Sequence, residues 1–108
     1  MTPGDLLKQV AEILEERGKT HGDYFENMTT IAHLWNADPN AADFSASDVA
    51  ISLAQVKLAR RMNGAAHNLD NYIDAIGYIA IGCVIAINTI GEETDEEQIK
   101  EAALRRFP

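Results

Sequence analysis

Apolar residues recur along this chain at positions i, i+3, i+4 and i+7, and no segment alternates as a strand would. Thr2 is suited to cap a first helix with Pro3 in its first turn, and Gly18 is suited to end it. Ser45 and Asp48 resemble a capping box ahead of a later helix. The pattern predicts four main helices, over residues 3–17, 23–37, 46–63 and 69–90.

A shorter helix is expected near the end of the chain, because Thr94 and Glu97 form a capping box ahead of residues ending in two arginines. We therefore predict an all-α fold, a bundle of four main helices plus a short C-terminal helix, in a single domain over residues 1–108. The apolar stripe of the third helix is expected to consist of Val49, Leu53, Val56, Leu58 and Met62.

The fourth predicted helix is apolar almost all round, which is typical of a helix buried on every side. Its apolar run over residues 75–87 contains two glycines and is shorter than a membrane span, so we expect a core helix and no membrane contact. Cys83 is expected to be a small core residue. A short chain has little surface with which to bury such a helix, so we expect a homo-oligomer that uses this helix.

The formal net charge is −8, which argues against direct binding to a nucleic-acid backbone. An anionic nucleotide remains compatible with this charge if a metal ion or a local group of cations receives it. The start of the chain does not resemble a signal peptide, and we expect a cytoplasmic protein.

Asp70 and Asp74 lie four residues apart and thus on one face of the fourth predicted helix, with Asn71 beside them. Buried acids are costly unless they are paired, hydrogen-bonded or bound to a metal. Two readings are open: the pair holds Mg²⁺ or a substrate, or it anchors a structural network with the cations of the chain. Asp70 is also placed where the helix dipole favours an acid.

The turn before the second predicted helix forms another polar group. Gly22 allows a sharp turn, after which His21, Asp23 and Glu26 offer a donor and two sets of oxygen ligands, with Asn27 close behind. The alternative is that Asp23 simply caps the helix and His21 lies in solvent.

Lys57, Arg60 and Arg61 place three cations within five residues near the end of the third predicted helix. Such a group can receive a phosphate. It can equally pair with Asp70 or Asp74 across the short helix hairpin, or lie in solvent as a charged face.

Three motifs in this order resemble a family of small, uncharacterised bacteriophage and prophage proteins. They are GKTHGD at residues 18–23, DVA at 48–50 with KLAR at 57–60, and DNYIDAIGY at 70–78. The resemblance covers about residues 12–87 and implies a phage origin, with the host cytoplasm as the compartment.

The segment from Asp70 to Asp74 also resembles the metal-binding helix of the MazG-like all-α nucleoside triphosphate pyrophosphatases. That family pairs an ExxE helix with an ExxD helix around Mg²⁺ and releases pyrophosphate. In this resemblance Asp74 matches the last Asp, Asn71 stands at a Glu position, and residues 52–57 carry no ExxE pair. Asp23 and Glu26 have the required spacing on the preceding helix.

The leading hypothesis is therefore a MazG-like, Mg²⁺-dependent nucleotide-binding protein or nucleoside triphosphate pyrophosphohydrolase. The metal ligands would be Asp23, Glu26, Asp70 and Asp74; Asp70, Asp74 and His21 would be catalytic; Lys57, Arg60, Arg61, Asn27 and Asn71 would bind the substrate. The rival hypothesis is a non-enzymatic, acidic accessory protein that binds and inhibits a host protein. The single-site hypothesis requires the His21 turn to lie close to Asp74.

Overall fold

The computed structural model describes residues 1–64, 69–90, 100–101 and 104, without the side chains of His21 and Ile90. Over these residues the chain is all-helical, as predicted, with four helices and no strand. The helices are α1 (Pro3–His21), α2 (Tyr24–Trp35), α3 (Ala46–Met62) and α4 (Leu69–Ile90). The predicted short C-terminal helix falls mainly on residues outside this description.

The helix ends follow the capping signals with one correction. Thr2 and Asp5 form a reciprocal capping box on α1, and Ser45 and Asp48 form another on α3. Gly18 does not end α1, because the helix continues to His21 and stops at Gly22. Gly22 has φ 79° and ψ −161°, a region that side chains rarely adopt, so it is the glycine that the turn requires.

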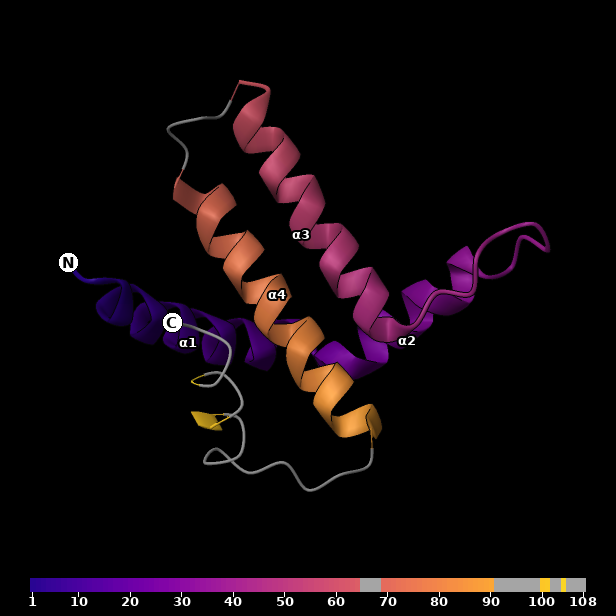
Figure 1. Ribbon diagram of the computed structural model, residues 1–108, viewed down its shortest axis with the longest axis horizontal. Coiled ribbons are helices and arrows are strands. Elements are labelled where there is room, and N and C mark those ends of the chain that lie inside the picture. The colour runs from indigo at the N-terminus through magenta and orange to yellow at the C-terminus, as the bar shows by residue number, and fades with distance from the viewer. Residues whose placement is uncertain (65–68, 91–99, 102–103, 105–108) are drawn as a thin grey trace.

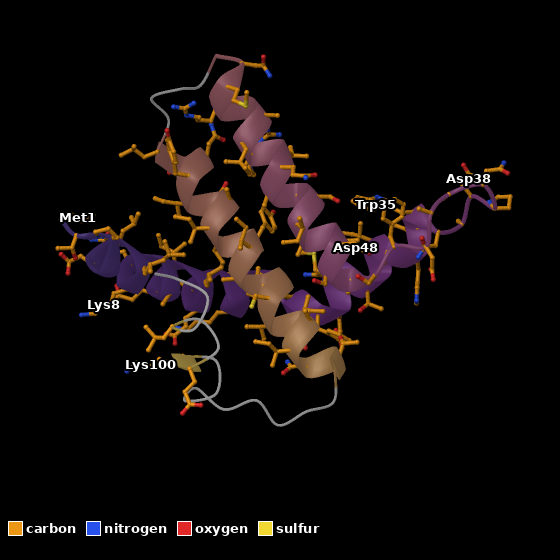
Figure 2. The ribbon with its side chains drawn as sticks, viewed as in Figure 1. Met1, Lys8, Trp35, Asp38, Asp48 and Lys100 are labelled. Carbon is orange, nitrogen blue, oxygen red and sulfur yellow. The ribbon has the colours of Figure 1, made fainter. Side chains whose placement is uncertain are left out.

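α3 and α4 form an antiparallel hairpin, and α1 and α2 cross behind it (Figure 1). α2 packs mainly on α3, and α1 packs on α4. The loop between α2 and α3, with Asp38 at its tip (Figure 2), is closed by Asn36, whose side chain donates to the carbonyl of Phe44 and accepts from its amide, both at 2.8 Å.

The core lies where α2, α3 and α4 meet. Its buried apolar members are Met28, Ala32, Val49, Ala50, Ile81 and Ile85. Small residues bring the hairpin helices close together, since a Cβ at Gly82 would lie 3.3 Å from the Ala50 Cβ and 3.2 Å from the Ile51 Cδ1. The buried stripe of α3 therefore consists of short side chains, Val49, Ala50 and Ala54.

Several residues predicted to be in the core are exposed instead. Val56, Leu58 and Met62 lie at the surface of α3, and Cys83 is exposed on α4. α4 is not buried on every side within one chain: Ile79 is 49% exposed and Val84 is 55% exposed. By length and composition alone, Leu69–Thr89 is long and apolar enough to cross a membrane. Only 28% of its most apolar window is buried within the single chain. Among the described residues, α4 therefore keeps exposed apolar side chains both beside the hairpin, at Ile79, and at the second cavity, at Val84.

Candidate functional site

Asp74, in the second turn of α4, is held between two cations from different helices. Its Oδ1 accepts from Arg17 Nη1 of α1 at 2.9 Å, and its Oδ2 lies 3.1 Å from Lys57 Nζ of α3. The Asp74 side chain is 17% exposed and that of Lys57 is 20% exposed, whereas Arg17 is 47% exposed. Asp74 thus joins α1, α3 and α4 at a site that solvent reaches mainly from the side of Arg17.

The two cations keep Asp74 ionised. Burial raises the pKa of the Asp74 carboxyl, but hydrogen bonds from Arg17 and Lys57, together with their charges, outweigh burial and lower the pKa below its ordinary value of 3.8. The hydrogen bond to Asp74 likewise raises the pKa of Arg17. Asp74 and Arg17 are therefore both charged near neutral pH, and they form an ion pair within an acidic chain.

A cavity of about 440 Å³ opens beside this ion-paired trio, between α1, α2 and α4. Arg17 and Asp74 lie at its polar side, and Asn27 adds an amide from α2. Its lining consists of Leu14, Arg17, Tyr24, Asn27, Met28, Asp74, Gly77, Tyr78 and Ile81. The cavity combines apolar and aromatic walls with a few convergent polar groups, which is the usual composition of a small-molecule site.

Local packing fixes the walls of this cavity. The Tyr24 hydroxyl donates to the carbonyl oxygen of Leu14 at 3.0 Å, which ties the start of α2 to α1. A Cβ at Gly77 would lie 3.3 Å from the Leu14 Cδ2, so Gly77 lets α1 approach α4. Asp74, Gly77, Tyr78 and Ile81 follow the i, i+3, i+4, i+7 spacing of one helix face, which is why all four line the cavity.

The two acids predicted as metal ligands near the turn before α2 lie at the N-terminus of that helix. Asp23 is the N-cap of α2 and accepts from the amides of Phe25, at 2.7 Å, and Glu26. Glu26 lies exposed in the first turn. Asp23 also borders a second, more apolar cavity of about 780 Å³, which shares Leu14, Tyr24 and Ile81 with the first. The two polar motifs thus lie at neighbouring cavities, with Asn27 reaching the one that contains Asp74.

The three cations of α3 separate. Lys57 contacts Asp74, which matches the structural alternative that the sequence left open. Arg61 Nε donates to the Tyr72 hydroxyl at 2.7 Å, with its guanidinium carbon 5.6 Å from the centre of that ring. Arg60 is exposed near the end of the helix. The arginine that pairs with Asp74 is therefore Arg17, and not Arg60 or Arg61.

Asp70 and Asn71 lie one turn before Asp74 on α4. Asp70 is exposed in the first turn, where the helix dipole favours an acid, and Asn71 is buried, with 6% of its surface exposed. Within the part of the chain that the structure describes, no three His, Cys, Asp or Glu residues gather closely enough to hold a metal ion. Asp74 is the acid that lines the cavity.

Sequence reasoning did not select Arg17 or Tyr78 as site residues. Tyr78 was detectable, because it follows Asp74 by four residues on the same helix face. Arg17 gave no such signal, since a cation ahead of Gly18 is a common way to end a helix.

Comparison with known proteins agrees with the predicted phage origin. A family model described as a domain of unknown function (DUF6378) matches residues 5–86. The "Gene 55 protein" of Mycobacterium phage L5 is 34% identical over 77 residues, which cover 70% of this chain and 49% of the phage protein, so the chain spans about half the length of that relative. No solved structure matches the chain. The chain is thus homologous to a bacteriophage protein and belongs to the uncharacterised DUF6378 family.

Proposed function

We propose that this protein binds a nucleotide in the cavity between α1, α2 and α4. The observation that carries the proposal is the position of the Arg17 guanidinium, which is 47% exposed and lies on Asp74 at the polar side of a cavity walled by Tyr24 and Tyr78. Arginine presents a planar fork of donors that matches a phosphate, and aromatic rings offer faces against which a base can stack. A volume of about 440 Å³ suits a ligand of this size.

Asp74 gives this site a way to respond to its ligand. A phosphate that takes donors from Arg17 competes with the Asp74 carboxylate for the same guanidinium. The carboxylate then becomes available to a cation that arrives with the nucleotide. Mg²⁺ is commonly held by one or two carboxylates together with substrate phosphates, so one acid at the cavity fits a magnesium–nucleotide complex better than a resident metal site.

Pyrophosphohydrolase activity of the MazG type is the more specific form of this proposal. The position of Asp74 in the helix that resembles an ExxD helix supports it, and so does the charged, partly buried setting of that carboxylate. The roles proposed for Asp23, Glu26 and Asp70 as further metal ligands require them to come closer to Asp74 when a nucleotide is bound. Nucleotide binding is therefore measured first, and release of pyrophosphate second.

Isothermal titration calorimetry with nucleoside mono-, di- and triphosphates, each with and without Mg²⁺, tests the proposal. Arg17→Gln removes the guanidinium and should weaken binding at least about tenfold, the loss of one charge-assisted contact worth about 1.4 kcal/mol. Lys8→Gln, which removes an exposed cation elsewhere on α1, is the matched control and should bind like the wild type. Equal weakening by both changes, or no heat with any nucleotide, contradicts the proposal. Release of pyrophosphate in the same mixtures decides between binding and turnover.

A non-enzymatic role in the host cytoplasm is the second proposal, favoured by the net charge of −8 and by the apolar residues exposed on α3 and α4. In this role the protein binds a host protein and inhibits it. The two proposals differ at Arg17, because a surface interaction through α3 and α4 does not use a residue that lines the cavity between α1, α2 and α4. Pull-down of the same host protein by wild type and Arg17→Gln, with no nucleotide binding by either, would favour the second proposal.

A further inference from the structure

The α3–α4 hairpin exposes an apolar surface on the side away from α1 and α2. We call it the outer face; it consists of Ile51, Leu58, Met62, Leu69, Tyr72, Ile79 and Cys83. Met62 is 75% exposed, Leu69 is 69% exposed and Ile79 is 49% exposed. In Figure 1, α4 passes in front of α1 and α2, and among the helices that the structure describes none covers it from the viewer's side.

The outer face is continuous across the two helices. Ile51 of α3 lies against α4 at Gly82, where a Cβ would be 3.2 Å from the Ile51 Cδ1. Near the other end of the hairpin, the Tyr72 hydroxyl accepts from Arg61 Nε of α3. Exposed apolar side chains on both helices therefore form one surface and not two separate patches.

The sequence of α4 has the repeat of a helix-packing seam on this side. Leu69, Ile76 and Cys83 are spaced by seven residues, as are Tyr72, Ile79 and Ala86, and all six are apolar. Both acids of the helix, Asp70 and Asp74, fall outside these positions. The helix thus carries about three heptads of apolar residues on the side away from the cavity that Asp74 lines.

We propose that the outer face is the interface of a homodimer, in which the α3–α4 hairpin of one chain packs on that of a second copy. The seam from Leu69 to Ala86 spans 18 residues, which is about 27 Å of helix at about 1.5 Å per residue. With the two hairpin helices spaced by about 8–10 Å, the outer face is nearly 20 Å wide, so its projected footprint is roughly 500 Å². Because side chains stand out from this plane, the accessible area that a second copy would bury is larger than the footprint and comes into the range of the ~800 Å² per partner of a standard interface.

A second copy also fits the side chains of the seam. A symmetric dimer brings the same surface of both chains together, so this surface must be complementary to its own copy. If two α4 helices pack antiparallel about the middle of the helix, Ile76 of one chain lies opposite Cys83 of the partner subunit. The seam holds no charge that such a dimer would have to bury unpaired.

A lipid bilayer is a poorer occupant for the same helix. The opposite side of α4 holds Asp74 in ion pairs with Arg17 and Lys57, and these charges would lie at membrane depth if α4 crossed a bilayer. The inference of a dimer does not rest on the proposed nucleotide site, because the residues of the outer face do not line that cavity.

Sedimentation equilibrium of the full chain at micromolar concentration tests this proposal. We expect a dimer for the wild type and at least a hundredfold rise in the dissociation constant for Ile79→Lys, which places a charge in the seam. Leu34→Lys is the control, because Leu34 is 69% exposed on α2, outside the outer face, and should leave the dimer intact. A wild-type monomer, or equal dissociation by both lysine variants, overturns the proposal.

Alkylation of Cys83 gives an independent readout that does not depend on a destabilising variant. The thiol lies within the proposed interface and is exposed in the single chain. The rate of alkylation should fall as the protein concentration rises through the dissociation constant, whereas Ile79→Lys should react at one rate throughout. A rate that is independent of concentration in the wild type, or protection of Cys83 only on addition of neutral phosphatidylcholine vesicles, contradicts the dimer.

Discussion

The two sides of α4 carry charged and apolar residues in the opposite arrangement to that of a typical surface helix. On the inward side, Asp74 is held by Arg17 and Lys57 next to a cavity with aromatic walls. On the outward side, the seam is apolar, and Leu69, Ile79 and Cys83 are exposed. A surface helix normally turns its charges to water and its apolar stripe to the core.

The two sides of α4 require different partners for stability. A carboxylate on the inward side is stable only with partners, and two other helices supply them. Apolar residues on the outward side cost free energy while they face water, and a second chain can remove them from it. One side of the helix is apolar because it packs within the chain, and we propose that the other is apolar because it packs against a second chain.

The largest expected difference is between two isoleucines of α4, one of which is buried and the other exposed. Ile85 is 5% exposed in the core, so Ile85→Ala should lower the free energy of unfolding by about 2–4 kcal/mol. Ile79 is 49% exposed, and Ile79→Ala should cost the isolated chain less than about 1 kcal/mol. Urea unfolding of both variants at low protein concentration measures these costs. Similar losses for the two would contradict the assignment of the two sides.

The next effect concerns the charge on the inward side. Asp74→Asn leaves Lys57 partly buried without its partner, and we expect a loss of about 1–3 kcal/mol, between the values for exposed and buried ion pairs. Thermal melts with and without Mg²⁺ measure it. A loss that is the same in both conditions assigns Asp74 a structural role, whereas a Mg²⁺-dependent difference in the presence of nucleotide supports the nucleotide site.

Acid should remove the contribution of Asp74 gradually. Because its folded pKa is lowered below 3.8 by Arg17 and Lys57 against the effect of burial, the carboxylate stabilises the fold above that pH and loses this effect as the pH falls through the folded pKa. The difference in melting temperature between wild type and Asp74→Asn should stay constant from about pH 7 to pH 5 and shrink below about pH 4. The lowered pKa of Asp5, which accepts from the Thr2 amide, is common to both proteins and cancels. A difference that grows in acid would reverse the assigned sign.

The smallest effect is expected at the edge of the outer face. Tyr72→Phe removes the hydroxyl that accepts from Arg61 but keeps the ring beneath the guanidinium. Because both groups are exposed, the free energy of unfolding should change by less than about 0.5 kcal/mol. Chemical denaturation measures this change, and self-association should remain as in the wild type. A loss above 2 kcal/mol would show that this contact holds the hairpin together.

The fold was largely predictable because its signals are local. The N-cap predicted at Thr2 and the capping box predicted at Ser45 gave the starts of α1 and α3 correctly, and the apolar spacing placed all four helices. The end of α1 was wrong at Gly18, because a glycine inside a helix costs only about 1 kcal/mol and the φ of the turn is satisfied at Gly22 instead. The prediction that Leu58 and Cys83 are buried was also wrong. The spacing of apolar residues indicates which of them share a helix face, but not which neighbouring element covers that face.

The candidate site was predictable only in part. Asp74 was selected by its position in an apolar helix, and Lys57 by its place in the hairpin. Arg17 was missed because its contact with Asp74 spans 57 residues of sequence, a separation that no local pattern records. The cavity itself depends on how α1 crosses α4 at Gly77, which follows from tertiary packing.

Backbone amide NMR of the labelled chain tests the central claim that one side of α4 lines a nucleotide site and the other forms a dimer interface. Titration with Mg²⁺ and a nucleoside triphosphate should shift the amides of Asn27 and Gly77 at the cavity, and dilution should shift those of Ile79 and Cys83 on the outer face. We expect the nucleotide and the dilution to shift two separate sets of residues. Two results together would contradict this claim: the nucleotide shifts no cavity amide, and dilution shifts no amide of the outer face.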